Sequence, residues 1–263
     1  MITVTEELVV AREEDGLAVV MLNRPAKRNA INLAMWQGLK AIFDELSQSR
    51  QVRAVILTGG GGNFSAGGDI SEFATVRATV EAGTFYEHAE EAALLAVLHC
   101  AKPTVAEISG FAIGGACALA LACDFRVADA ASSFFIPAGR LGIVYSRLES
   151  ELLLRQVGLT NAKLILFSGE RMSAEEALRL GLVSQVAESD VAAASRRFAR
   201  RFAASAPLSV AGNKFILNVL SRGEADVRSA EVDRFIHLSM ASEDYKEGQQ
   251  AFREKRAPVF EGR

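Results

Sequence analysis

Short apolar runs alternate with longer amphipathic segments through the first half of the chain. Two runs rich in β-branched and aliphatic residues, at 8–12 and 17–22, flank a polar Glu-Glu-Asp-Gly turn and predict a β-hairpin. The run at 53–58, RAVILT, is almost wholly apolar, as expected of a strand that is buried on both faces. Shorter runs at 104–108 and 125–128 predict two further strands.

Amphipathic segments between these runs predict helices. Residues 35–46 carry apolar side chains at helical spacing after Asn32, a favourable N-cap residue. Residues 84–98 predict a second helix, and residues 110–124 a third. The apolar face of the second helix is expected at Ala92, Leu95 and Leu98. Strands that alternate with helices in this way indicate a largely parallel, layered α/β core.

From residue 147 onward the pattern becomes mostly helical. The sequence Ser-Ala-Glu-Glu at 173–176 has the form of a capping box, and Gly181 is placed to end the helix that follows it. Further helices are expected at 190–204, 207–220, 225–241 and 242–255, with a brief extended piece at 183–186. We expect an α/β core over residues 1–205 and a helical region over 206–263. The many apolar positions of the second region predict packing against another subunit, and the alternative is that it covers its own core.

Composition narrows the class of protein. Half of the 263 residues are hydrophobic, the net charge is −3, and no basic stripe is present, which argues against a nucleic-acid partner. The apolar run at 111–123 is too short to span a bilayer, and the N-terminus does not have the form of a signal peptide. The three cysteines lack metal-ligand spacing. We therefore expect a cytoplasmic protein with reduced thiols, no metal and no membrane contact.

Two glycine-rich stretches are the candidate binding elements. Residues 110–124, GFAIGGACALALACD, carry no charge before Asp124, and Gly114-Gly115 open a helix of small residues. Bare amides at a helix start suit an oxygen that develops negative charge, although close packing in a core is the alternative explanation. Residues 59–69, GGGGNFSAGGD, lack the Lys and Ser/Thr of a phosphate loop. What remains is a loop whose backbone can approach a ligand at Gly67-Gly68, or a flexible surface loop.

Together these stretches resemble the crotonase superfamily, which includes the enoyl-CoA hydratase/isomerase family. Matching pieces are LNRP at 22–25, FSAGGD at 64–69, KP at 102–103, the whole of 110–124, 169–183, SEDYKEG at 242–248 and FREKR at 252–256. The resemblance implies a β-β-α spiral core, a helical C-terminal trimerisation region, and homotrimers that often pair into hexamers. It also implies an acyl-CoA substrate and no separate cofactor, because coenzyme A is part of the substrate.

The resemblance also implies roles for particular residues. The backbone amides of Gly68 and Gly115 would hold the thioester oxygen as an enolate forms, and one such donor typically changes the rate roughly 10²–10³-fold. Four residues fall where the family lines the path of coenzyme A, with the last three at its adenine end: Lys27, Ala66, Asp69 and Ile70. Phe252 and Lys255 match residues that reach the coenzyme A of a neighbouring subunit.

The two glutamates with which enoyl-CoA hydratases add water are replaced. Alignment with the motif puts Ala118 and Ala138 at their positions, and alanine can neither take nor give a proton. The run at 140–145, RLGIVY, looks instead like the methylmalonyl-CoA decarboxylase branch, whose active-site tyrosine falls at Tyr145. That branch has a histidine where this chain has Gly68.

These residues give a leading interpretation and several alternatives. We expect decarboxylation of a malonyl- or alkylmalonyl-CoA, with Tyr145 supplying a hydrogen bond or a proton and Arg140 as a candidate partner for the substrate carboxylate. The alternatives are an enoyl-CoA hydratase or isomerase with unusual acid–base groups, and an acyl-CoA-binding protein without activity. A serine hydrolase would need a histidine beside Ser65 or Ser109, and none is placed there by motif. The remaining titratable candidates are expected on helix surfaces or in structural positions: His88, His99, His237, Glu149 and Glu151.

Overall fold

Two β-sheets form the centre of the molecule in a computed structural model that describes residues 2–13 and 15–263. The larger sheet has the strand order β1-β2-β3-β4-β5-β7-β10, and the smaller one has the order β6-β8-β9. The strands of the larger sheet are β1 (Ile2–Thr5), β2 (Leu8–Arg12), β3 (Leu17–Leu22), β4 (Ala54–Gly59), β5 (Thr104–Ile108), β7 (Phe125–Asp129) and β10 (Gln185–Ala187). Those of the smaller sheet are β6 (Phe111–Ile113), β8 (Ser133–Phe135) and β9 (Arg171–Ser173).

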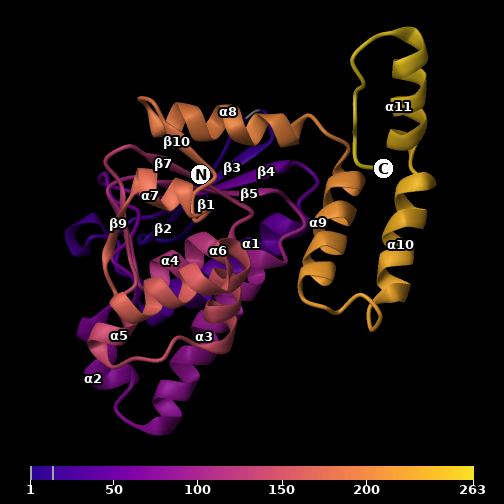
Figure 1. The fold of residues 1–263 in the computed structure, drawn as a ribbon. Helices are drawn as coiled ribbons and strands as arrows, with labels where there is room; N and C mark the ends of the chain where they lie inside the picture. The colour runs from indigo at the N-terminus through magenta and orange to yellow at the C-terminus, as the bar shows by residue number, and fades with distance from the viewer. Residues whose placement is uncertain (1, 14) are drawn as a thin grey trace.

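Helices surround these sheets (Figure 1). In the first half of the chain they are α1 (Leu33–Gln48), α2 (Phe73–Val76), α3 (Val80–Leu98), α4 (Gly115–Ala122) and α5 (Ala138–Leu141), with short 3-10 turns at Pro25–Lys27 and Ile70–Glu72. In the second half they are α6 (Arg147–Ser168), α7 (Ala174–Arg179), α8 (Val191–Ala203), α9 (Pro207–Ser221), α10 (Ser229–Met240) and α11 (Glu243–Glu254). The mixed α/β class expected from the sequence is confirmed.

Strand pairing follows the hydrophobic pattern. Strands β2 and β3 are antiparallel, with Val10 opposite Val20, which confirms the predicted hairpin. Part of its polar turn, residue 14, lies outside the described residues. Strands β3, β4, β5, β7 and β10 pair in parallel, as the alternation of strands and helices predicted.

The larger sheet is covered on both faces, which explains why β4 reads as a continuous apolar run. Its residues Ala54 and Ile56 face the cluster under α8, and Val55 and Leu57 face the main core. Figure 1 shows α8 on one side of the sheet and α1, α3, α4 and α6 on the other. Because successive side chains of a strand point to opposite faces, every position of β4 up to Thr58 is buried.

The sequence predicted a single helix over residues 110–124, but only part of this segment is helical. Its first part forms β6, which pairs in parallel with β8, and helix α4 begins only at Gly115. Gly110 and Gly114 have φ values of +63° and +55°, and these left-handed conformations turn the chain at either end of the strand. The strands of the smaller sheet were missed because they are three residues long and have no clear alternation.

The start of α1 agrees with its predicted capping residue, whereas the buried face predicted for α3 is correct only at Leu98. The Asn32 side chain accepts a hydrogen bond from the Met35 amide at 2.8 Å, which confirms the N-cap of α1. The most buried residues of α3 are Tyr86, Ala93, Leu94, Val97 and Leu98, whereas Ala92 and Leu95 are only partly buried. The helix is rotated from the predicted orientation because it packs against both α1 and α4.

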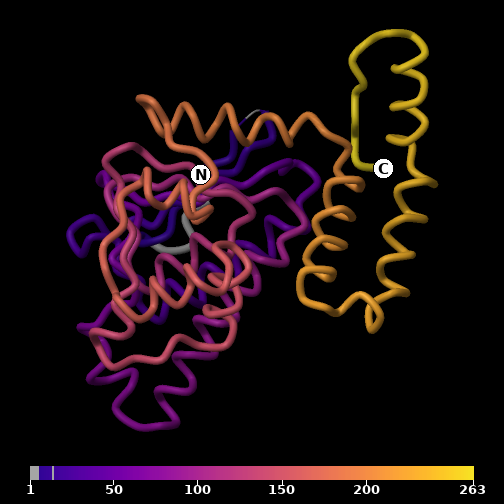
Figure 2. The backbone as a smooth tube through the Cα atoms, viewed as in Figure 1, coloured from indigo at the N-terminus to yellow at the C-terminus, as the bar shows by residue number. Residues whose placement is uncertain are grey.

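The last three helices stand beside the core rather than within it. Figure 2 shows the chain leaving α8 and continuing through α9, α10 and α11, and returning beside α11 to its end. Large apolar side chains are exposed along this region, at Leu217, Leu220, Val227, Met240 and Phe252. The boundary at 205/206 remains a prediction. Among the described residues, no helix is both long and apolar enough to cross a membrane.

Candidate active site

The two glycine-rich stretches come together in the fold. Ser65 forms an isolated parallel bridge with Ala112, in which the Ser65 amide donates to the Phe111 carbonyl and the Ile113 amide donates to the Ser65 carbonyl, both at 3.1 Å. A β-carbon at Gly67 would stand 3.4 Å from the Gly115 nitrogen and would clash with the Ile113 carbonyl. Since Gly67 also has a φ of +88°, only glycine fits at this meeting point.

The amides of Gly68 and Gly115 are left unpaired. Around Gly68, the Ile31 amide donates to the Gly67 carbonyl at 2.8 Å and the Asp69 amide donates to the Ile31 carbonyl at 2.9 Å. In residues 2–13 and 15–263, the Gly68 and Gly115 amides donate no hydrogen bond. Gly115 is the first residue of α4, where a helix has no acceptor for its own N–H. Both groups remain available to an oxygen atom of a ligand.

One wall beside these glycines is aromatic and comes from α1, α2 and α3. The Trp36 indole N–H donates to the Tyr86 hydroxyl at 2.9 Å. A β-carbon at Gly68 would lie 3.0 Å from that hydroxyl, and one at Gly115 would lie 3.7 Å from the Trp36 ring. The Phe73 ring meets Tyr86 edge-to-face at 5.7 Å. Burial raises the pKa of Tyr86 well above its ordinary value, so its hydroxyl stays neutral.

A carboxylate that the sequence reasoning missed stands against Gly115. The Glu90 Oε1 atom is 2.7 Å from the point where a β-carbon of Gly115 would lie. Glu90 is half-buried, and its carboxylate has no hydrogen bond or ion pair with any described residue. Burial, together with the charge of Glu149, raises the pKa of Glu90 to about 8, although Arg77 acts in the opposite direction. Glu90 follows Tyr86 by four residues and precedes Leu94 by four, so a correct assignment of the buried face would have found it.

Tyr145 lies at the same place but is already engaged. Its hydroxyl donates to the Gly114 carbonyl at 2.8 Å. Burial raises the pKa of Tyr145, and the nearby Cys117, Glu149 and Glu90 add to that effect. The hydroxyl proton is therefore donated to Gly114, the residue before α4, and the hydroxyl oxygen can still accept a hydrogen bond. The predicted role of Tyr145 as a donor to substrate stays a prediction.

Glu149 is the second carboxylate of this region. It belongs to the first turn of α6, where its Oε2 accepts from the Ser146 amide at 2.8 Å and the Ser146 hydroxyl accepts from the Glu149 amide at 3.2 Å. This capping box fixes the side chain. Glu149 is half-buried, and burial raises its pKa, so it is not the helix-surface glutamate that the sequence suggested.

The residues expected along the coenzyme A path lie on the loops before and after Gly68. Asp69 is buried, and its carboxylate accepts from Arg24 at 2.9 Å and from the Ser71 amide at 3.0 Å. Its side chain is therefore used inside the protein. Lys27 and Ile70 are exposed, and Ala66 is partly buried. Coenzyme A contacts at these positions remain predictions.

The other three candidates lie on different elements. Arg140 is exposed on α5, and its Nε donates to the Ser168 carbonyl at the end of α6, at 3.0 Å. Phe252 is exposed in α11, and Lys255 follows that helix in a left-handed conformation, with φ of +55°. None of the contacts described for these residues joins them to Gly68 or Gly115.

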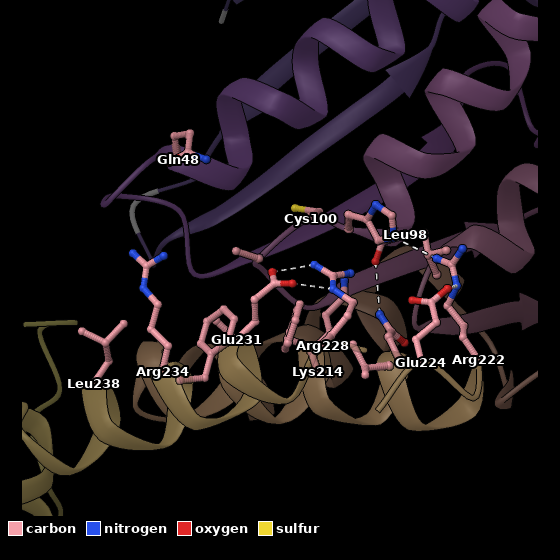
Figure 3. Close-up of a pocket in the computed structure, with 17 residues that line it drawn as sticks. Gln48, Leu98, Cys100, Lys214, Arg222, Glu224, Arg228, Glu231, Arg234 and Leu238 are labelled. Atoms are coloured by element: carbon pink, nitrogen blue, oxygen red, sulfur yellow. Dashed lines mark hydrogen bonds and ion pairs between the residues drawn. The ribbon is translucent and has the colours of Figure 1, made fainter. Parts of the chain in front are cut away.

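A cavity of about 570 Å³ lies away from the glycines, between the end of α3 and helices α9 and α10 (Figure 3). Its wall is polar on the α10 side, where Arg228 pairs with Glu231 at 2.6 Å. Lys214, which also lines it, is paired with Asp124 at 2.7 Å. The described residues that line this cavity include neither of the two glycines nor Glu90. It is thus separate from the candidate active site.

Comparison with known proteins identifies the family of this chain. Residues 12–263 match the family described as Enoyl-CoA hydratase/isomerase. The chain is 34% identical over 251 residues to the short-chain-enoyl-CoA hydratase of Clostridium acetobutylicum, covering 94% of this chain and 95% of that protein. It is 33% identical to the 2,3-dehydroadipyl-CoA hydratase of Escherichia coli, covering 98% and 99%.

A solved structure shows the same fold. The crystal structure of an enoyl-CoA hydratase/isomerase family protein from Hyphomonas neptunium superimposes with a TM-score of 0.92 at 35% identity, covering 98% of each chain. The fold and the site define a crotonase-superfamily protein. The chain belongs to the enoyl-CoA hydratase/isomerase family. The relatives from Clostridium acetobutylicum and Escherichia coli are named hydratases, so the comparisons favour the hydratase alternative over the decarboxylation that we expected from Tyr145.

Proposed function

We propose that this protein is a hydro-lyase that adds water to the double bond of an enoyl-CoA thioester, or removes it in reverse. The observation that carries the proposal is the pair of unpaired amides at Gly68 and Gly115, on two segments that meet beside a titratable carboxylate. Attack of water on C3 places negative charge on the thioester oxygen. Two backbone donors fixed in advance stabilise that charge, and removing one donor typically costs roughly 10²–10³ in rate.

Alanine stands at both positions where the motif alignment expects the hydratase glutamates. Any hydration must therefore use other side chains to transfer protons. Ala118 and Ala138 are both buried and offer only methyl groups. Decarboxylation, our expectation from the run before α6, needs no base to remove a carbon-bound proton. It does need a donor for the enolate and a partner for the substrate carboxylate. The hydroxyl of Tyr145 donates to the Gly114 carbonyl, and the one contact described for Arg140 is with the Ser168 carbonyl, away from the two glycines. These contacts give neither residue the role that decarboxylation requires.

Two assays distinguish these reactions. Crotonyl-CoA is added and the loss of its enoyl absorbance is followed. Malonyl-CoA and methylmalonyl-CoA are then tested separately for release of CO₂. We expect hydration to be rapid and to survive Tyr145→Phe with a loss of less than about tenfold, because the proton of that hydroxyl is already donated to the Gly114 carbonyl. Release of CO₂ without hydration, abolished by Tyr145→Phe, would overturn the proposal.

We further propose that the protein works as a homotrimer or a pair of trimers. The exposed apolar residues of α9 and α10 are the support for this, since such a surface on a single chain usually meets another protein. Light scattering after size exclusion gives the mass directly. Leu217→Asp on α9 is expected to lower this mass, and Val80→Asp, at an exposed apolar position on α3, is expected to leave it unchanged. In the trimer Phe252→Ala is expected to raise KM without changing kcat.

A further inference from the structure

Helix α3 presents one carboxylate to the space next to the oxyanion-binding amides. Glu90 lies four residues from the buried Tyr86 and four from the buried Leu94, so it belongs to the inward face of the helix. A glutamate on such a face normally has a partner. Within the described chain Glu90 has none, although it approaches Gly115 so closely that a methyl group there would collide with its Oε1 atom.

We propose that Glu90 is the catalytic residue that exchanges the proton at the α-carbon of the bound acyl-CoA. Gly115 supplies one of the two amides for the thioester oxygen, and the α-carbon is the next atom but one from that oxygen. A carboxylate beside Gly115 is therefore within reach of the α-carbon. This inference rests on the proposed hydro-lyase function. It explains how the site can transfer protons although positions 118 and 138 hold alanine.

The charges around Glu90 prepare it to act as an acid. Burial has the largest effect on its pKa, and the carboxylates of Glu149 on α6 and Glu87 on α3 raise that pKa further. Arg77, whose guanidinium stacks 4.4 Å from the Phe73 ring centroid and 4.8 Å from that of Tyr86, lowers it. The result, about 8, keeps most of the Glu90 population protonated at neutral pH.

The second carboxylate completes the balance of the reaction. As the water oxygen bonds to C3, one water proton passes to the Glu149 carboxylate, and the electron pair of the double bond moves to the thioester as an enolate. The carboxylic acid of Glu90 then gives its proton to C2, and the enolate pair forms the new C–H bond. Water has been added as H and OH, and one proton returns from Glu149 to Glu90 through solvent. Burial raises the pKa of both groups, but the Ser146 amide donates to Glu149 and lowers its pKa, whereas Glu90 has no such donor among the described residues. A difference of this kind between two carboxyl groups commonly sets base and acid roles.

Glu90→Gln tests this assignment, with Glu91→Gln as the matched control on the next residue of the same helix. We expect Glu90→Gln to lower kcat for crotonyl-CoA hydration by about 10²–10⁴, the usual contribution of a proton-transferring group. Its dissociation constant for acetoacetyl-CoA, whose bound enolate absorbs light, is expected to stay within about threefold of the unmodified protein because both amides remain. Glu91→Gln is expected to match the unmodified protein in both assays.

A pH profile supplies a readout that a purely structural role would not move. We expect kcat/KM of the unmodified protein to fall as pH rises through about 8, as Glu90 loses its proton. Arg77→Gln removes a charge that lowers this pKa, so it is expected to shift the fall to higher pH. This second variant keeps the test decisive even where Glu90→Gln does not fold.

The two proposals fail in different ways. If the unmodified protein hydrates crotonyl-CoA and Glu90→Gln does so at a similar rate, the assignment of Glu90 is overturned and the function stands. If the unmodified protein hydrates no enoyl-CoA, the function is overturned. Exchange of the C2 protons of butyryl-CoA in D₂O, read by mass spectrometry, then decides on Glu90. Exchange that is lost in Glu90→Gln supports the residue, and the absence of exchange in the unmodified protein overturns it.

Discussion

The indole of Trp36 and the hydroxyl of Tyr86 are joined by a buried hydrogen bond of 2.9 Å, which ties α1 to α3 beside the two glycines of the candidate site. The ring centroids of Tyr86 and Phe73 are 5.7 Å apart, so one phenol contacts side chains of two other helices, α1 and α2, beside the candidate site. Fixing these helices fixes the distance between Glu90 on α3 and the start of α4. Rigid support of this kind is what a pair of backbone donors needs to act on a developing charge.

Tyr86→Phe is expected to lower the free energy of unfolding by about 1–3 kcal/mol, because the buried Trp36 N–H loses its acceptor. Urea denaturation followed by tryptophan fluorescence measures this directly, since Trp36 is the only tryptophan. Tyr245→Phe removes a hydroxyl from a half-exposed ring and is expected to change stability by less than about 0.5 kcal/mol. Equal effects of the two variants would contradict a structural role for the Trp36–Tyr86 bond.

Gly115→Ala is expected to reduce kcat by about 10–10³ while the protein stays folded. The added methyl group would stand 2.7 Å from Glu90 Oε1 and would displace both the carboxylate and the thioester oxygen. Gly83→Ala, on α3 where nothing lies within 4 Å of the new atom, is the control. It is expected to keep full activity and to gain up to about 1 kcal/mol of stability, because alanine favours a helix. If Gly115→Ala keeps full activity, the proposal that Gly115 binds the thioester oxygen is wrong.

Glu90 is expected to make stability depend on pH in a definite direction. Its pKa rises from an ordinary 4.5 to about 8 on folding, so the stabilising effect of its bound proton is complete below 4.5 and is lost as pH rises through 8. The side-chain amide in Glu90→Gln does not titrate, so the variant loses no stability through this position as pH rises. Its stability relative to the unmodified protein is expected to increase by about 1–3 kcal/mol between pH 5 and pH 9, a discounted range because the carboxylate still reaches solvent. Thermal melts at both pH values measure it, and parallel curves for the two proteins would count against the raised pKa.

Asp69 is expected to have the opposite dependence. Burial acts to raise its pKa, but the hydrogen bonds from Ser71 and Arg24 outweigh it and the pKa falls below the ordinary 3.8. The stabilisation is thus present above 3.8 and is lost as pH falls through the lower folded value. Asp69→Asn is expected to cost about 2–4 kcal/mol at pH 7, since Arg24 keeps a partly buried charge with one partner fewer.

Two controls test the role of Asp69. One is the pH dependence of the stability lost in Asp69→Asn, and the other is the exposed ion pair between Asp44 and Lys40. The difference between Asp69→Asn and the unmodified protein should shrink as both approach pH 3, where the carboxylate begins to be protonated. Asp44→Asn breaks the exposed pair with Lys40 and is expected to change stability by less than about 0.5 kcal/mol at any pH. A large effect of Asp44→Asn, or none of Asp69→Asn, would show that burial does not separate these two ion pairs.

The sequence by itself determined most of the local structure and the class of protein. Alternating short apolar runs and capped amphipathic segments were enough to predict β2, β3, β4, β5, β7 and most helices, because hydrophobic period and capping act within a few residues. The two glycine stretches were enough to predict the family, and the family match confirms it. Bare amides follow from glycine at a helix start, which is also a local property.

Only the tertiary structure decided which side chains surround those amides. The rotation of α3 depends on its simultaneous packing against α1 and α4, which no pattern within the helix specifies, and that rotation brings Glu90 to Gly115. Likewise the bond from Tyr145 to Gly114 joins residues 31 positions apart and changes what the tyrosine proton can do. The sequence gives the types and spacings of these residues. The contacts that give them chemical roles arise from long-range packing, because burial and charge act through space rather than along the sequence.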